Sequence, residues 1–152
     1  MKQVILSLAT VLMMGISAFA GTNATGDVNQ LAVNSFNKDF SSARNIVWEQ
    51  KANFIKATFT LNDQVMFAYY NTDGSLQAIV RNIVSDQLPI NLLTNLKKEY
   101  GGFWISDLFE MAANDQTTYY VTLESADKKI VLKSEGADGW SVYSKTRKDG
   151  LQ

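Results

Sequence analysis

The sequence of 152 residues contains no cysteine, no histidine and a single proline. Without cysteine there is no disulfide framework, so the fold must be stabilised by packing. The missing histidine and cysteine also remove the usual general base near neutral pH, thiol nucleophiles and the common zinc ligands. Glycine-rich loops that bind phosphates or dinucleotides are absent as well. We therefore expect a protein that is not an enzyme and that carries no cofactor.

Neither positive nor negative charge is present in excess. The chain has 14 Lys and Arg against 15 Asp and Glu, which gives a formal net charge of −1, and it contains no long basic run. Nucleic-acid binding depends on clustered positive charge. We therefore expect no nucleic-acid partner. The length fits one domain, or two small units that share a core.

The N-terminus has the order of a secretory signal peptide. Lys2 precedes the apolar run 4–16, and Ala18-Phe19-Ala20 places small residues before a cleavage site. The apolar run is shorter than the roughly 20 residues that a membrane-spanning helix needs. We expect residues 1–20 to be removed between Ala20 and Gly21. The mature chain would then be soluble, without a membrane span, and periplasmic or secreted.

Helical and strand periodicities follow one another twice. We expect residues 21–27 to be a polar, flexible lead, in which Asp27 is a candidate N-cap for a helix over 28–40. The stretch 53–61 alternates apolar and polar residues, as a half-buried strand does. The dipeptide at 62–63 and the Asn-Thr-Asp-Gly sequence at 71–74 predict turns between further strands.

The second half repeats this order. Pro89 begins a helix whose apolar face holds Ile90, Leu93, Leu96 and Tyr100, and the glycine pair at 101–102 ends it. Strands 103–113, 116–125, 129–133 and 140–148 follow, with turns between them. We interpret this as an internal duplication, with one repeat over about 28–84 and the other over about 85–148.

Two tryptophans stand at corresponding points of the two repeats. Trp48 and Trp104 each follow a predicted helix and begin, or lie in, a predicted strand. We expect both side chains, together with Phe103, to enter the core where each helix passes into the sheet.

These patterns predict an α+β fold of two layers. Helices segregated from antiparallel strands pack on one face of a sheet. We expect two helices on one face of a roughly eight-stranded sheet, with the other face at least partly open to water.

Alternation along the strands places a set of polar and aromatic residues on the face away from the helices. Tyrosine offers a large contact area with few rotatable bonds to freeze, and neighbouring cations steer partners. This face is either an ordinary solvated sheet surface or a recognition surface. Its candidate binding residues are Lys56, Tyr120, Tyr143, Lys145 and Arg147.

Carboxylates do not form a metal site in the sequence. Asp107 and Glu110 are three residues apart in a predicted strand and point to opposite faces. The loop 71–75 lacks the further acidic ligands of a calcium loop. We expect no metal.

One set of core positions extends over both repeats as a family-like pattern. In the first repeat these are Phe36, Phe40, Ser41, Ala43, Val47 and Trp48, and the second repeat adds Leu88-Pro89, Tyr100, Ile105 and the YYVTL stretch at 119–123. The pattern resembles that of the secreted, beta-lactamase-inhibitor-like PepSY-like family of Gram-negative bacteria. The resemblance covers about 28–148. Ser41 departs from it, because that family often has proline there.

The resemblance implies a tandem helix-and-sheet repeat, exported to the periplasm or cell surface. It also implies a module that binds proteins or inhibits enzymes through its sheet face. The first functional hypothesis is a non-catalytic, secreted binding module with an unidentified periplasmic or extracellular protein as partner. The alternative is a periplasmic binder of small amphiphiles or glycans, with an aromatic cleft between helices and sheet.

The signal peptide gives a direct test. Intact-mass measurement of exported protein should give a chain that starts at Gly21, because the Ala-x-Ala order places the cleavage site after Ala20. A mature chain that retains Met1 would contradict this interpretation.

Overall fold

A computed structural model describes residues 28–148. The predicted signal peptide 1–20, its cleavage site Ala20–Gly21, the lead 21–27 and the candidate N-cap Asp27 lie outside these residues. Among the described residues no helix is long and apolar enough to cross a membrane.

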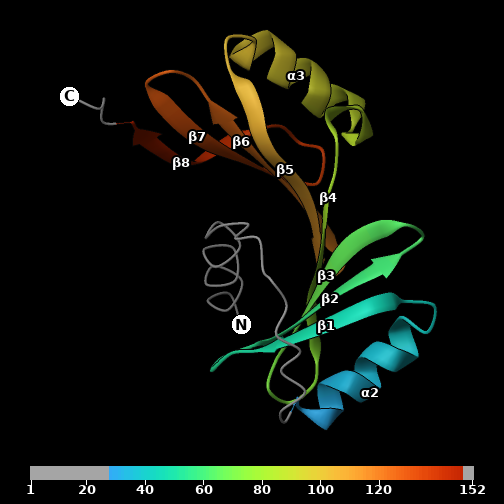
Figure 1. Ribbon diagram of the computed structural model, residues 1–152. Helices are drawn as coiled ribbons and strands as arrows, with labels where there is room; N and C mark the ends of the chain where they lie inside the picture. The colour runs from blue at the N-terminus through green and yellow to red at the C-terminus, as the bar shows by residue number, and fades with distance from the viewer. Residues whose placement is uncertain (1–27, 149–152) are drawn as a thin grey trace.

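Within residues 28–148, two α-helices and eight strands follow one another in the predicted order, with a short 3-10 helix before the second α-helix (Figure 1). The first half contains α2 (Gln30–Asp39), β1 (Arg44–Gln50), β2 (Ile55–Leu61), β3 (Gln64–Tyr70) and β4 (Leu76–Asn82). The second half contains η1 (Ser85–Gln87), α3 (Ile90–Tyr100), β5 (Trp104–Ala113), β6 (Gln116–Glu124), β7 (Lys128–Glu135) and β8 (Ser141–Arg147). Each half is thus an α-helix followed by four strands.

All eight strands form one antiparallel sheet in chain order, from β1 to β8. The Asn-Asp dipeptides at 62–63 and 114–115 make two of its tight turns, and all four of these residues have positive φ values between 50° and 61°. Asparagine and aspartate tolerate this conformation better than most residues do, and it suits the twist of a two-residue hairpin. The predicted α+β, two-layer fold is confirmed.

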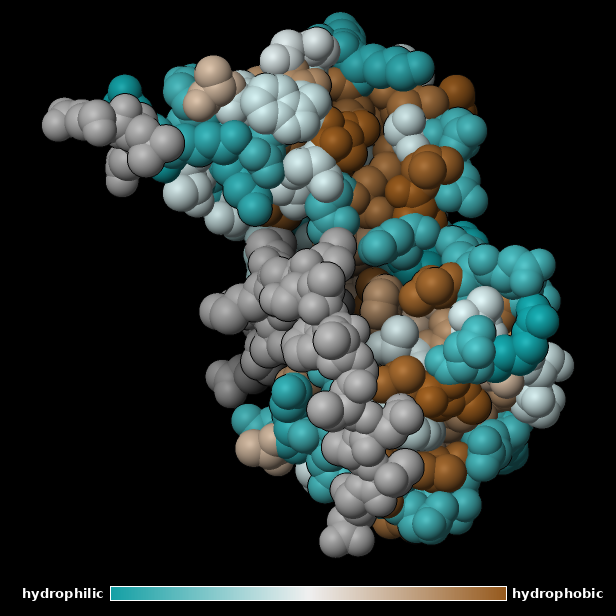
Figure 2. Space-filling model, in the orientation of Figure 1, coloured by the Kyte–Doolittle hydropathy of each residue, from teal (hydrophilic) through white to brown (hydrophobic). Residues whose placement is uncertain are grey.

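Each helix packs on its own half of the same sheet face. In the core between α2 and the sheet, Phe36 of the helix packs with Ile55 and Phe59 of β2. In the core between α3 and the sheet, Leu96 of the helix packs with Val121 and Leu132 of the sheet. Figure 2 shows hydrophobic residues mainly between the two ends of the molecule, whereas the outer surfaces at both ends are largely hydrophilic.

The ends and faces of the helices differ in detail from the prediction. Asn29, rather than Asp27, caps α2, because its side-chain oxygen accepts a hydrogen bond from the Leu31 N–H. In α3 the fully buried residue is Leu92, whereas Ile90 is 77% exposed. The buried face of α3 is therefore centred on Leu92 and Leu96, with Leu93 and Tyr100 partly buried beside them, and Ile90 lies outside it.

Gly74 joins the first half tightly to α2. Its φ is +85°, and an added Cβ would lie 2.6 Å from the Leu31 Cβ. The turn at 71–74 also binds the start of α2, because the Asn29 side-chain amide donates a hydrogen bond to the Thr72 carbonyl. In the second half, the Asn91 amide donates to the Ala137 carbonyl. Both helices are therefore tied to a turn that contains an Asp-Gly pair.

The two tryptophans do not occupy equivalent places. Trp48 is half-buried and packs edge-on against Phe36, with ring centroids 5.3 Å apart. Trp104 is 53% exposed, and Phe103 is the residue that packs into the α3 core. The expectation that Trp104 is a core residue is wrong. Trp48 stands twelve residues after Phe36, and Leu108 stands twelve after Leu96, so Leu108 takes the Trp48 place in the second half.

The tryptophans should therefore differ in their contribution to stability. Trp48→Ala is expected to lower the free energy of unfolding by about 2–3 kcal/mol, somewhat less than a fully buried large-to-small change. Trp104→Ala should cost about 1 kcal/mol or less, as exposed positions do. Urea denaturation of both variants measures the difference, and equal losses would contradict the assigned burial.

Tyr70 gives a second stability prediction. Its hydroxyl is the one buried side-chain oxygen or nitrogen in residues 28–148 without a hydrogen-bond partner. Burial raises the pKa of this phenol. Because an unsatisfied buried hydroxyl costs about 1–3 kcal/mol, Tyr70→Phe should raise the free energy of unfolding by about 1 kcal/mol.

Tyr69→Phe is the matched control. Tyr69 is the neighbouring buried tyrosine on the opposite face, and its hydroxyl is not a buried group left without a hydrogen-bond partner. It should not gain stability. Thermal melts of the two variants make the comparison, and a Tyr70→Phe variant that melts earlier than the wild type would overturn the interpretation.

Candidate binding face

The sheet face away from the helices is defined by the strand register, because residues paired across antiparallel strands share a face. Lys56 pairs with Tyr69, which pairs with Ala78, and the row continues through β4 to β8. We call this surface the helix-free face. Its larger side chains are those of Lys56, Phe67, Tyr69, Val80, Trp104, Phe109, Met111, Tyr120, Lys129, Val131, Lys133 and Tyr143.

A hydrophobic cluster lies at the centre of this face and spans both halves of the chain. Tyr69 and Val80 come from the first half, and Phe109, Tyr120 and Val131 from the second. The Phe109 and Tyr120 rings stack with centroids 5.0 Å apart. The face is therefore more apolar than the predicted solvated surface, and the cluster contributes to the packing between the halves.

Tyr120 belongs to this cluster and not to the exposed surface. It is only 2% exposed, and burial raises its pKa to about 12. The prediction of an exposed Tyr120 is wrong, because sequence alternation assigns a side chain to a face but not its depth. Neighbours on the same face enclose it, including Tyr143, whose ring meets it edge-on with centroids 5.7 Å apart.

Tyr143 is half-buried and lies on the helix-free face as predicted, but Lys145 and Arg147 do not share that face. The register shifts in β8, so that Val131 pairs with Ser144 and Leu132 with Val142. Such a bulge adds one residue and reverses the alternation beyond it. Lys145 pairs with Ile130, which belongs to the core under α3, and Arg147 follows it two residues later on the same face. The predicted grouping of these cations with Tyr143 is wrong.

Lys56 lies on the helix-free face, at its first-half end. Its ammonium group is 2.8 Å from the Glu49 Oε1 atom and 5.1 Å from the centroid of the Phe67 ring. The cation is therefore held in place by a carboxylate and an aromatic ring. Lys56 and the two tyrosines thus share one face, but Lys56 lies on β2 and the tyrosines lie on β6 and β8.

Trp104 is the residue on this face that sequence reasoning missed. It pairs with Glu124, and Glu124 pairs with Lys129, which places all three on the helix-free face. The Lys148 ammonium lies 5.0 Å from the Trp104 ring centroid and 2.7 Å from the Glu124 Oε2 atom. The sequence signal for its exposure was the glycine pair at 101–102. These glycines end α3, and of the two aromatic residues that follow them only Phe103 packs beneath the helix.

Asp107 lies beside this group, opposite Thr122 on the same face. Burial raises the pKa of its carboxyl. No second carboxylate pairs with it in the register, and no group of three or more possible metal ligands occurs in residues 28–148. The arrangement offers contact surface and charge.

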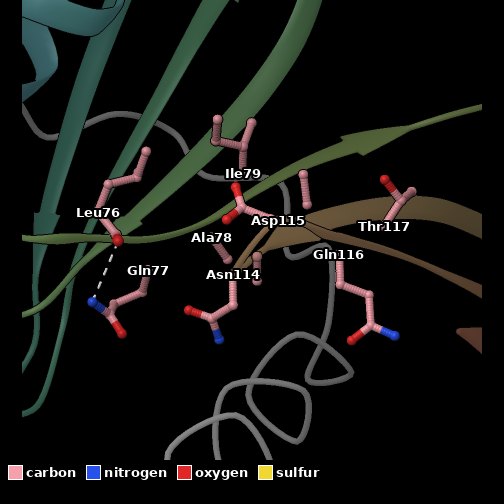
Figure 3. Close-up of a pocket in the computed structure, with 10 residues that line it drawn as sticks. Leu76, Gln77, Ala78, Ile79, Asn114, Asp115, Gln116 and Thr117 are labelled. Carbon is pink, nitrogen blue, oxygen red and sulfur yellow. Dashed lines mark hydrogen bonds between the residues drawn. The ribbon is translucent and has the colours of Figure 1, made fainter. Parts of the chain in front are cut away.

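A shallow pocket of about 370 Å³ opens between β4 and the β5–β6 hairpin (Figure 3). Small alanines line it together with polar side chains, among them Gln77, Asn114 and Gln116. Its lining contains no aromatic residue. It therefore does not match the aromatic cleft between helices and sheet that the alternative hypothesis requires.

Comparison with known proteins finds relatives by structure only. No protein-family model and no curated protein matches the chain. A DUF2874 family protein from Bacteroides ovatus superposes with a TM-score of 0.70 at 15% identity, covering 80% of this chain and 89% of that one. A BLIP-like protein from Bacteroides fragilis superposes with a TM-score of 0.70 at 16% identity, covering 85% of this chain and 92% of that one. A Bacteroides eggerthii protein, described provisionally as periplasmic, superposes with a TM-score of 0.70 at 12% identity, covering 80% of this chain and 90% of that one.

At these identities the similarity shows the fold and leaves the activity open. It agrees with the beta-lactamase-inhibitor-like part of the resemblance seen in the sequence, whereas the PepSY-like part stays a prediction. The chain thus has the fold of BLIP-like and DUF2874 family proteins from Bacteroides.

Proposed function

We propose that this protein is an exported, non-catalytic module that binds another protein through its helix-free face. The observation that carries the proposal is the set of accessible aromatic side chains around the buried cluster of this face, namely Phe67, Trp104 and Tyr143. Aromatic residues are enriched at protein–protein contacts because they bury a large area at a low entropy cost.

The rim of the face suits a protein partner. Trp104, 53% exposed, stands at one end beside Lys148, and Lys56 stands at the other end beside Phe67. Lys129 is exposed between β6 and β8. In this arrangement the aromatic groups contribute most of the affinity, and the cations influence orientation and association rate.

Export is supported by the signal-peptide pattern of residues 1–20 and by the provisional periplasmic description of one structural neighbour. The BLIP-like description of another neighbour supports an inhibitor-like or binding role. The partner is an unidentified periplasmic or extracellular protein.

The test compares variants on the two faces of the sheet. Tyr143→Ala and Trp104→Ala should each weaken binding of the captured partner by at least about 1 kcal/mol, as interface truncations do. Val142→Ala is the matched control, because Val142 is 59% exposed and lies on the helix side of β8. It should leave affinity unchanged.

The cations provide a second matched pair. Lys129→Ala, on the helix-free face, should slow association, whereas Lys145→Ala, on the helix side, should not. A partner is captured from periplasmic extract by cross-linking, and binding is then measured by surface plasmon resonance with each purified variant.

The proposal fails if the captured protein binds the Trp104 and Tyr143 variants as tightly as the wild type, or if the helix-side variants lose as much affinity. Native mass spectrometry of the purified protein tests the alternative. A retained small amphiphile or glycan, displaced by these same variants, would favour that alternative function.

A further inference from the structure

The sheet ends at β8, whose outer edge pairs with no other strand among residues 28–148 (Figure 1). Residues 144–147 of β8 pair in unbroken register with residues 128–131 of β7, and all four of these β8 residues are exposed. The outer edge of such a strand presents unpaired N–H and C=O groups. It is therefore a template to which a further strand can add.

The ladder with β7 shows which main-chain groups point to this free edge. The Lys148 N–H donates to the Asp127 carbonyl, with nitrogen and oxygen 2.8 Å apart, so these two residues form a hydrogen-bonded pair. Hydrogen-bonded and non-hydrogen-bonded pairs alternate along an antiparallel ladder. Thr146 therefore also bonds to β7, whereas the N–H and C=O groups of Lys145 and Arg147 point outward.

Positive charge is concentrated at the same edge. Residues 128–148 contain six Lys and Arg against two Asp and Glu, a net charge of +4, whereas residues 28–127 contain seven against eleven, a net charge of −4. Lys128, Lys133 and Lys148 form ion pairs with carboxylates, but within the described part of the chain Lys145 and Arg147 form none. The outward main-chain groups and the unpaired cations thus belong to the same two residues.

The opposite edge of the sheet, formed by β1, lacks this combination. Its register with β2 shifts near Asn45, whose φ is 55°. Both of its charged residues are paired, Arg44 with Asp63 and Glu49 with Lys56. Because an irregular backbone protects an edge from pairing, β8 is the edge that suits an added strand.

We propose that the edge of β8 binds an extended acidic segment of another protein, antiparallel to residues 144–148 and with a carboxylate at every second residue. Paired residues of antiparallel strands share a face, so these carboxylates lie beside Lys145 and Arg147. Neutral side chains of the segment lie beside Ser144 and Thr146. A second copy of β8 is disfavoured, because it would place like charges opposite each other.

This site goes beyond the proposed function and does not rest on it. Lys145 and Arg147 lie on the helix side of the sheet, so a partner on the helix-free face does not need them. Partner binding is measured with the Trp104 and Tyr143 variants and the edge with a separate probe. Either proposal can therefore fail without the other.

The probe is a capped pentapeptide, Thr-Glu-Thr-Glu-Thr, titrated into the exported protein labelled with ¹⁵N. We expect saturable amide shifts centred on residues 144–148, with a dissociation constant in the millimolar range. In the proposed register the two glutamates form the hydrogen-bonded pairs with β8. N-methylation of both glutamates should therefore weaken binding about tenfold or more. N-methylation of the central threonine, whose N–H points away from β8, should leave the affinity unchanged.

Variants of β8 test the charges. Lys145→Gln combined with Arg147→Gln should weaken pentapeptide binding about threefold or more; both are replaced because a single exposed ion pair contributes little. The matched control is Lys38→Gln combined with Lys51→Gln, which removes the same charge from exposed positions of the first half and should leave the affinity unchanged.

Three results would each overturn the proposal. They are the absence of shifts at residues 144–148, equal affinity for the two methylated peptides, and equal affinity for the two double variants. The methylated peptides carry the same charge and require no substitution in the protein. They therefore test main-chain pairing even if a variant disturbs the fold.

Discussion

The four residue pairs between β4 and β5 hold the two halves of the molecule in one sheet. Every other strand pairs within its own half, so without this ladder each helix and its four strands would form a separate small unit. On the helix side, Arg81 and Glu110 reinforce the ladder through two hydrogen bonds of 3.0 and 3.2 Å. A paired arginine and carboxylate of this geometry fixes orientation as well as contributing energy.

The other side of the same ladder carries the hydrophobic cluster of the helix-free face. Val80 and Tyr69 from the first half meet Phe109 and Met111 from the second, so the candidate binding face and the joint between halves share residues. Substitutions at the centre of the face therefore affect stability first. Residues at its rim, such as Trp104 and Tyr143, are the ones whose replacement tests binding without removing the core.

The ladder between β4 and β5 covers only part of each strand. β4 runs from Leu76 to Asn82 and β5 from Trp104 to Ala113, yet only residues 79–82 of β4 pair with residues 109–112 of β5. The turn at 71–74 holds the start of the first half against α2 through Gly74 and Asn29. Because that end of β4 is fixed to the first half, it does not follow β5 into the second half.

Sequence alone determined the order of elements, the antiparallel class and the faces of β2 and β6, because side-chain periodicity reports directly on local backbone conformation. It also determined the Asn-Asp turns, since few residues tolerate their positive φ values. Tertiary structure decided the depth of Tyr120 and the exposure of Trp104, which depend on neighbours from distant strands. It also decided the side taken by Lys145 and Arg147, because a bulge in β8 reverses the alternation and has no marker in the sequence. The partial ladder between β4 and β5 likewise follows from how the two halves pack, and neither strand's own sequence specifies it.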